Sequence, residues 1–237
     1  MLSKAWHRSP RRQAGLSLIE MMVGLTVGLI VVGGAIMLTV NQLGEHRRLL
    51  LETQIQQDLR ATSDMMLRDL RRAGYWGRPE TGVWAPAAAA PASHNYATLT
   101  ANGNSQLEYS YSQSSYRSSN TPSVVENNVV DAATEAFGFK LENRVLKFKL
   151  GQSWQPLTDE NVMWITAFTI TPVVQTVGLA DACEVPCLDG SNLCLRQQIR
   201  YIRISLTGQA RHDPAVQRRV DVSARVRNDL IEGACGT

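Results

Sequence analysis

The sequence lacks the short motifs that mark common enzyme classes. No HExxH zinc motif, GxSxG nucleophile elbow or phosphate-binding P-loop occurs in its 237 residues. Its four histidines lie far apart, at positions 7, 46, 94 and 212. We therefore predict a protein that is not an enzyme and that binds no cofactor or metal.

An overall excess of positive charge is also missing once the N-terminal residues are set aside. Residues 1–15 contain four basic residues and no acid: Lys4, Arg8, Arg11 and Arg12. Of the 24 basic residues, 20 remain against 21 acidic ones, a net charge of −1. Recognition of nucleic acid needs a basic face on the folded domain. The composition therefore predicts no nucleic-acid partner.

Charged residues and proline are both absent from positions 21–44. At ~1.5 Å per residue a helix of this length extends about 36 Å, enough to cross a hydrocarbon core of about 30 Å. No small-residue A-x-A site follows, which argues against a cleaved secretory signal. The basic residues precede the run, so the positive-inside rule predicts a cytoplasmic N-terminus and a periplasmic or extracellular remainder.

One carboxylate, Glu20, stands at the start of the apolar run, within the segment LSLIEMMVGL. A charge in this setting is unfavourable, most strongly near the bilayer centre. Taken alone, Glu20 is equally compatible with an interfacial charge that reaches the headgroups and with a functional residue.

The residues around Glu20 favour the second interpretation. Residues 12–20 (RQAGLSLIE) follow a basic leader, place Gly15 before Leu16, and set Glu20 five positions after that glycine. This segment resembles the class III signal of type IV prepilins and type II secretion pseudopilins, although many members have Phe in place of Leu16. The resemblance implies that a prepilin peptidase removes residues 1–15 and methylates the new amino group of Leu16.

Cleavage would give Glu20 a physical role. A buried charge is tolerated when it is paired. Glu20 can offset the Leu16 amine of a neighbouring subunit, or its own, and so favour one axial register between packed helices. We interpret Glu20 as an assembly residue and not as a catalytic acid.

A helical pattern continues beyond the transmembrane residues 16–44. Apolar positions recur in steps of three or four, with charged residues between them: Leu51, Ile55, Leu59, Thr62, Met66, Leu70 and Ala73. They predict an amphipathic helix over residues 45–74 that continues the first one, about 87 Å from Leu16 to Ala73. Gly74 occupies the position expected for a C-cap.

The end of this helix carries a second family resemblance. Residues 67–77 (LRDLRRAGYWG) are similar to the helix end of the PilW group of minor pilins. A long helix that is half membrane span and half domain core resembles the pilin-like lollipop, and its crossing of a mostly antiparallel sheet predicts an α+β fold. In it the long helix packs on a mostly antiparallel β-sheet head, here residues 75–237.

Alternating apolar residues predict the strands of this head. They lie at 137–141 and 146–150, joined by a turn at 142–144, and at 162–170, 202–206 and 220–226, the last two forming an antiparallel pair. The Ala- and Pro-rich residues 78–104 predict a surface connection with little regular structure. The Ser- and Tyr-rich residues 110–123 predict a flexible loop or, alternatively, a contact surface.

The four cysteines all lie in the last quarter of the chain: Cys183, Cys187, Cys194 and Cys235. Beyond the membrane they are expected to form disulfides. Three pairings are open, and we expect Cys235 to join Cys194 or a neighbour. Closing a loop of about 40 residues in this way stabilises the fold by roughly 3–4 kcal/mol in the chain-entropy model.

Two metal sites compete with simpler interpretations of this region. The C-x₃-C-x₆-C spacing is not a usual zinc pattern, and the compartment favours disulfides. The oxygen-bearing side chains of Asp181, Glu184, Asp189 and Asn192 suit calcium. A polar, turn-forming loop explains the same residues, and we predict no metal there.

The resemblance implies a PilW-like minor pilin that primes type IV pilus assembly and sits in the tip complex, supporting twitching motility and adhesion. Implied partners are other minor pilins, the major pilin, a PilY-type tip adhesin and the prepilin peptidase. The protein would cross the bacterial inner membrane once, with a periplasmic head, and later reach the pilus tip at the cell surface. One alternative is a J-type pseudopilin of a type II secretion system. Another is a membrane-anchored periplasmic enzyme or binding module, which would retain its leader and contain a deep pocket.

Overall fold

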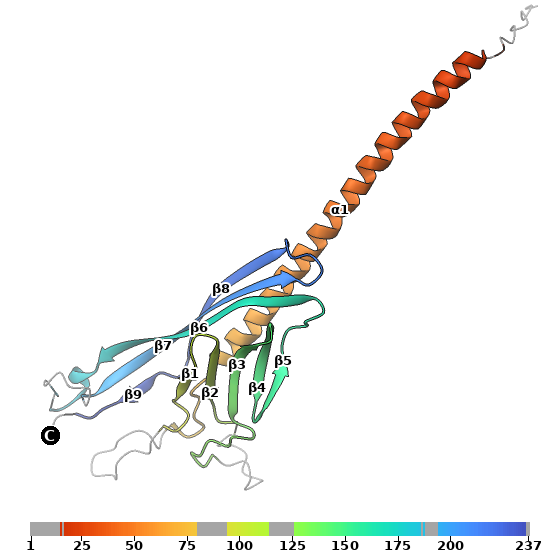
Figure 1. Cartoon of the computed structure of the whole chain (residues 1–237). Coiled ribbons are helices and arrows are strands. Elements are labelled where there is room, and N and C mark those ends of the chain that lie inside the picture. Colours follow the sequence, from red (N-terminus) through yellow and green to blue (C-terminus); the bar gives the residue numbers. More distant parts are fainter. Residues whose placement is uncertain are drawn as a thin grey trace, which may run out of the picture. The chain divides into compact units, whose positions relative to one another are not determined.

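The computed structural model describes residues 15, 17–79, 94–113, 126–185, 187 and 194–235. The chain divides into two compact units, Met1–Leu49 and Leu50–Thr237. One helix, α1, runs over Leu18–Leu70 and so contributes to both. The second unit also contains the β-sheets (Figure 1). The predicted α+β class, one long N-terminal helix with antiparallel sheets, is confirmed.

Helix α1 ends slightly before the predicted residue. Its last helical residue is Leu70, and residues 71–74 form a turn. The N–H of Arg72 donates to the carbonyl of Asp69 (2.9 Å) and that of Ala73 to Leu70 (3.2 Å), so the last turn tightens to i→i+3 bonding. Gly74 then adopts φ +71°, the left-handed conformation that glycine tolerates best.

The first sheet has the order β1-β2-β3-β4-β5, and all its neighbouring strands are antiparallel. Its strands are β1 (Leu99–Ala101), β2 (Gln106–Ser110), β3 (Ala136–Glu142), β4 (Val145–Leu150) and β5 (Ser153–Pro156). The predicted hairpin is confirmed, because β3 pairs with β4 across a turn at Asn143 and Arg144, both with positive φ.

The second sheet is built on two long strands, β6 (Met163–Gly178) and β7 (Arg196–Ala210). On the other edge of β7 lie β8 (Gln217–Arg225) and β9 (Leu230–Glu232), each antiparallel to it. A short 3₁₀ helix, η3 (Ala180–Ala182), follows β6. The predicted antiparallel pair of strands is confirmed, with Ile204 opposite Val222.

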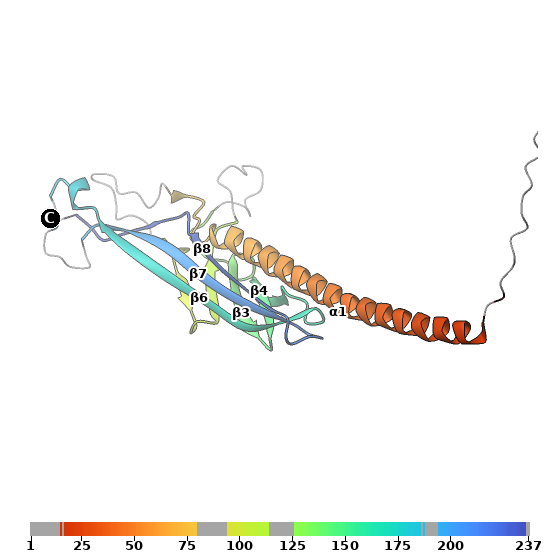
Figure 2. The same cartoon turned by 90° about the horizontal axis from the view of Figure 1, so that it is seen from above.

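The residues of α1 beyond Leu50 lie together with both sheets (Figures 1 and 2). Their buried side chains form one hydrophobic core. The predicted helical stripe is confirmed, since Ile55, Leu59, Met66 and Leu70 are each no more than 1 % exposed. Close approach requires a small residue on β7. A Cβ on Gly208 would lie 3.2 Å from Leu59 Cδ2. The alternation of strand side chains gives each sheet one core-facing side.

Two loop predictions were wrong in part. Residues 78–104 include β1, which pairs with β2 although its sequence LTA is too short to show alternation. At the start of the predicted 110–123 loop, Ser110 belongs to β2, and Tyr111 and Ser112 are each 3 % exposed. Composition missed this burial because Tyr111 finds a partner for its hydroxyl on α1. Residues 114–123 lie outside the described part.

Candidate assembly site

The predicted processing site is described only in part. Gly15 lies before the helix, and a Cβ added there would meet nothing within 4 Å. Leu16 and the basic leader residues 1–14 lie outside the described residues. The carbonyl of Ser17 accepts the first bonds of α1, from the N–H of Glu20 (3.0 Å) and of Met21 (3.2 Å). The cleavage between Gly15 and Leu16 and the methylation of Leu16 therefore remain predictions.

Glu20 occupies the first turn of α1, where the free N–H groups of the helix favour a negative charge. The residue is exposed. Within the described part of the chain, no ion pair or hydrogen bond engages its carboxylate. A carboxylate so placed is available to a cation supplied from outside this helix.

The helical surface around Glu20 is apolar and uncovered. Residues 17–50 are all exposed, among them large side chains such as Ile30 (74 %). A Cβ on Gly24 or Gly28 would meet nothing within 4 Å, so this GxxxG pair is open to a neighbouring helix.

The two threonine hydroxyls within the apolar run are bonded to the helix itself. Thr26 Oγ1 donates to the carbonyl of Val23 (2.9 Å) and Thr39 Oγ1 to that of Ala35 (2.9 Å). No other polar partner is needed for these hydroxyls in lipid. By length and composition α1 is able to cross a membrane, and it is the one such helix among the described residues.

At the other end of α1, the LRDLRRAGYWG segment joins the helix to the first sheet. Asp69 accepts hydrogen bonds from the hydroxyls of Tyr109 and Tyr111, the latter at 3.0 Å. The guanidinium of Arg72 lies over the Tyr111 ring, 4.3 Å from its centroid. Burial, followed by the nearby Asp69 charge, raises the pKa of both tyrosines, so both hydroxyls stay protonated donors.

A buried arginine, Arg200 on β7, reinforces this junction. It is 3 % exposed, and its guanidinium donates to the carbonyls of Ala97 and Asn228, the latter at 2.6 Å. Gly74 leaves room for it, because a Cβ there would lie 2.7 Å from Arg200 Nη2. Burial lowers the pKa of Arg200, as desolvation disfavours the charged form.

Sequence reasoning missed Arg200, although the sequence contained a signal. Side chains in a strand alternate between faces, and Arg200 has the same parity as Ile202 and Ile204, which lie in the core. A charged residue in a core-facing position points to a specific buried partner. His94 also lies near Arg200 and stacks on Trp76, with ring centroids 5.1 Å apart. Burial, followed by the charge of Arg200, lowers the pKa of His94.

Two further carboxylates were missed because no sequence pattern marked them. Glu126 and Glu135 are 3 % and 4 % exposed. Both lie against the hydroxyl of Tyr96, at 3.0 Å and 2.9 Å. The backbone N–H groups of Asn128 (2.6 Å) and Gln113 (3.0 Å) also donate to them. These hydrogen bonds satisfy the two carboxylates and explain why Glu126 and Glu135 are buried beside β2.

The cysteines form two disulfides, Cys183–Cys235 and Cys187–Cys194, with Cα separations of 5.5 Å and 5.3 Å. Of the partners we expected for Cys235, Cys194 or a neighbouring cysteine, Cys194 was wrong, and the partner is Cys183. Cys194 forms a parallel bridge with Ala234, and adjacent residues of an extended segment point to opposite sides. Cys235 therefore faces away from Cys194 and meets Cys183 instead.

The suggested calcium loop is described only at Asp181, in η3, and Glu184, because Asp189 and Asn192 lie outside the described residues. Within the described part of the chain, no group of three or more His, Cys, Asp or Glu side chains is arranged to hold a metal ion.

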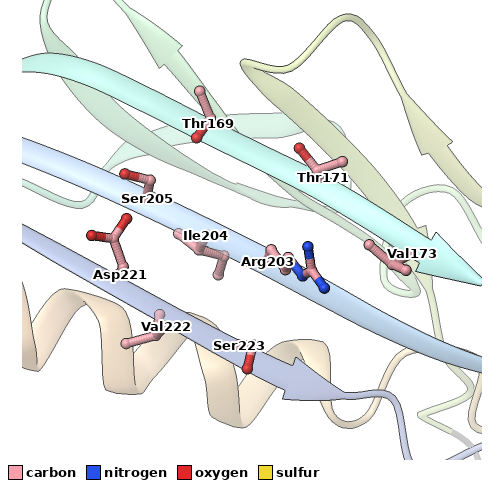
Figure 3. A pocket seen from close by; sticks show the side chains of 9 residues that line it. All are labelled: Thr169, Thr171, Val173, Arg203, Ile204, Ser205, Asp221, Val222 and Ser223. Carbon is pink, nitrogen blue, oxygen red and sulfur yellow. The ribbon is translucent and has the colours of Figure 1, made fainter.

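A shallow hollow lies on the side of the second sheet that faces away from the core (Figure 3). Threonines of β6 and serines of β7 and β8 line it, together with two charged residues, Arg203 and Asp221. Hydrogen bonds from Arg219 and Ser205 lower the pKa of the Asp221 carboxyl, so it stays ionised. The described lining of this hollow contains neither a histidine nor a cysteine.

These features define a structural class of protein. A long helix has an open apolar surface and a carboxylate in its first turn, and it continues into the core of an α+β unit. This is the architecture of a pilin-like protein anchored by one N-terminal helix.

Comparison with protein families supports the class and narrows it. Residues 10–36 match the model of the prokaryotic N-terminal methylation motif. Residues 48–226 match the model described as prepilin peptidase-dependent protein B. The chain belongs to the prepilin peptidase-dependent protein B family. No curated protein and no solved structure matches it significantly.

Proposed function

We propose that this protein is a PilW-like minor pilin, a structural subunit that helps to start type IV pilus assembly and stays at the pilus tip. The observation that carries the proposal is the uncovered apolar surface of α1 with Glu20 in its first turn, beside a predicted cleavage site. An enzyme would not need this arrangement, whereas a subunit that packs against other helices would.

One charge pair would hold neighbouring subunits in register. An isolated carboxylate in lipid is unfavourable by a few kcal/mol. Cleavage after Gly15 would create an amino group on Leu16, and the Glu20 carboxylate of a neighbouring helix would neutralise it. Because Glu20 lacks a partner within the described residues, pairing between subunits would satisfy both groups and select one axial register.

The open glycines support close packing in the same assembly. Gly24 and Gly28 leave a flat strip on α1, and nothing in the described chain covers it. Small residues at such spacing permit helices to approach closely in lipid, where dispersion and hydrogen bonding drive association. Partners of this kind would be other minor pilins and the major pilin, with a PilY-type adhesin beyond the head.

Removal of the leader and methylation of Leu16 are tested by mass spectrometry of the protein purified from pilus-bearing cells. The expected species begins at N-methylated Leu16, and Gly15→Val is expected to leave the leader attached. Recovery of a functional protein that still begins at Met1 would refute the proposed processing.

The assembly role is tested with three variants in a strain that lacks the native gene. Glu20→Ala is expected to insert in the membrane but to be depleted from sheared pili. Glu20→Asp should retain part of the incorporation, because the charge remains on a shorter side chain. Glu45→Ala is the matched control, since it removes an exposed carboxylate from the same helix outside the apolar run. Equal incorporation of Glu20→Ala and Glu45→Ala would exclude the pairing, and lost protein secretion with normal piliation would assign the chain to a secretion system.

A further inference from the structure

Four arginines gather on the surface where α1 ends. Arg71 and Arg72 belong to the turn after the helix, Arg225 is the last residue of β8, and Arg227 follows it. The N–H of Arg227 donates to the carbonyl of Arg71 at 3.1 Å, which holds these two backbone segments together. All four residues are exposed. Neither the helix pattern nor the strand pattern predicts that they meet.

Two of these arginines are already engaged. Arg72 lies 3.9 Å from Asp69 and covers the Tyr111 ring. Arg225 donates to Asp229 at 2.7 Å. In contrast, no ion pair or side-chain hydrogen bond joins Arg71 or Arg227 to any residue in the described ranges. Among the described residues, two positive charges within one small area therefore have no counter-charge.

The two free arginines line two adjoining hollows. The first, of about 520 Å³, is also lined by Arg72, Tyr75 and Gln113. The second is lined by Arg71 and Arg227 together with Ser223 and Arg225. A ligand in either hollow would thus lie against both of these arginines. We name this surface, formed by Arg71, Arg72, Tyr75, Arg225 and Arg227, the arginine patch.

We propose that the arginine patch binds carboxylate side chains on another protein, as a docking surface for an acidic partner. A guanidinium group presents a planar fork that matches a carboxylate in two-point contact. Arginine and tyrosine are also the residues that most often dominate protein–protein binding, and Tyr75 is 45 % exposed beside the free arginines. Positive charge that has no local counterion is complementary to an acidic surface.

The chemistry of the surrounding surface argues against nucleic acid. A nucleic-acid interface needs a continuous basic stripe that follows the phosphate backbone. Here the carboxylates of Asp69 and Asp229 flank the patch, and the chain after residue 15 has a net charge of −1. A local patch with acidic neighbours fits a protein surface of matching size.

The identity of the partner rests on the proposed function, under which it would be another subunit of the pilus. The binding of carboxylate side chains does not rest on the proposed function, and it is tested separately. Fluorescein-labelled octaglutamate serves as the probe, octaglutamine as its neutral counterpart, and fluorescence anisotropy with the full chain in neutral detergent as the readout.

The test variant is Arg71→Gln with Arg227→Gln. The matched control is Arg60→Gln with Arg203→Gln, which removes two exposed arginines elsewhere on the same unit, one on α1 and one in the lining of the hollow of Figure 3. The test variant should bind octaglutamate about tenfold more weakly, because it loses two charge-assisted contacts. The control should remain within about twofold of the wild type, because Arg60 and Arg203 do not line the arginine patch and their removal takes no contact from the peptide. Unchanged circular dichroism shows that the exposed substitutions leave the fold intact.

Two further experiments distinguish a protein carboxylate from free phosphate and from a lipid headgroup as the ligand of the arginine patch. Inorganic phosphate should displace the peptide no more effectively than chloride does at the same concentration. Phosphatidylglycerol vesicles should bind the test variant and the control variant equally. Equal octaglutamate binding by test and control variants would overturn the proposal. So would selective displacement by phosphate, or vesicle binding lost only in the test variant. Each of these results leaves the Leu16 and Glu20 experiments unaffected, so failure of the patch and failure of the pilin assignment are distinguishable.

Discussion

Replacing Gly74 by alanine tests how the end of α1 is joined to the sheets. Gly74 has φ +71°, a conformation that costs an L-residue roughly 1–2 kcal/mol. The new Cβ would also lie 2.7 Å from Arg200 Nη2. Because that guanidinium is buried, it would have to shift away from the carbonyl of Asn228. Losing a hydrogen bond to a charged group costs about 1.5–3 kcal/mol. We therefore expect Gly74→Ala to lower the free energy of unfolding by about 2.5–5 kcal/mol, the sum of these contributions.

The chain supplies two controls that separate the contributions. Gly103 also has positive φ, at +60°, but a Cβ there would meet nothing within 4 Å. Gly103→Ala should therefore show the conformational penalty alone, about 1–2 kcal/mol. Gly178 has neither a positive φ nor a neighbour, so Gly178→Ala should stay within about 0.5 kcal/mol of the wild type.

The measurement is urea unfolding of the full chain in detergent, followed by tryptophan fluorescence. Trp76 is 6 % exposed and lies two residues from Gly74, so it reports on this junction. A double change of Gly74→Ala with Arg200→Ala should be less destabilising than the sum of the single changes, because the clash is then absent. The reasoning fails if Gly74→Ala and Gly103→Ala lose the same stability, or if the double change is additive.

Three other predictions concern the same unit. Leu59→Ala should cost about 2–5 kcal/mol in urea unfolding, because Leu59 is fully buried between the helix and the sheets, and a loss below about 1 kcal/mol would contradict this packing. Cys235→Ser opens the disulfide with a sequence separation of 52 and should cost about 4 kcal/mol in the chain-entropy model. Reducing agent should then destabilise this variant far less than the wild type. Hydrogen bonds from Lys140 and Lys147 lower the pKa of Glu142 from 4.5 to about 2. Its contribution to stability is thus present above the ordinary pKa and is lost as pH falls through about 2. An NMR titration of Glu142 with a midpoint near its ordinary pKa would exclude this pairing.

Much of the framework follows from short-range sequence patterns. The apolar steps from Leu51 to Leu70 predicted the buried face of α1, because helical periodicity alone decides which side chains share a face. The β3–β4 hairpin and the β7–β8 pair followed from alternation. Strands β1 and β9 did not, since three residues do not establish a period and their pairing depends on distant neighbours.

The elements near the end of α1 show where local pattern is insufficient. Tyr111 lay in a segment whose composition indicated a loop, yet it is buried because its hydroxyl reaches Asp69, 42 residues earlier. Arg200 bonds Ala97, 103 positions away. The disulfide pairing required the Cys194–Ala234 bridge, which places Cys235 on the opposite side from Cys194. Each of these features depends on a contact between residues far apart in the sequence.

By itself the sequence determined the long apolar helix, its Glu20 carboxylate, the helical stripe and the α+β class, because charge, hydropathy and side-chain period act between residues close along the chain. Only the tertiary structure decided which cysteines pair, where Arg200 is buried and that Arg71 and Arg227 share one surface. Those outcomes depend on strand register and chain reversal, which bring together residues that no local pattern connects.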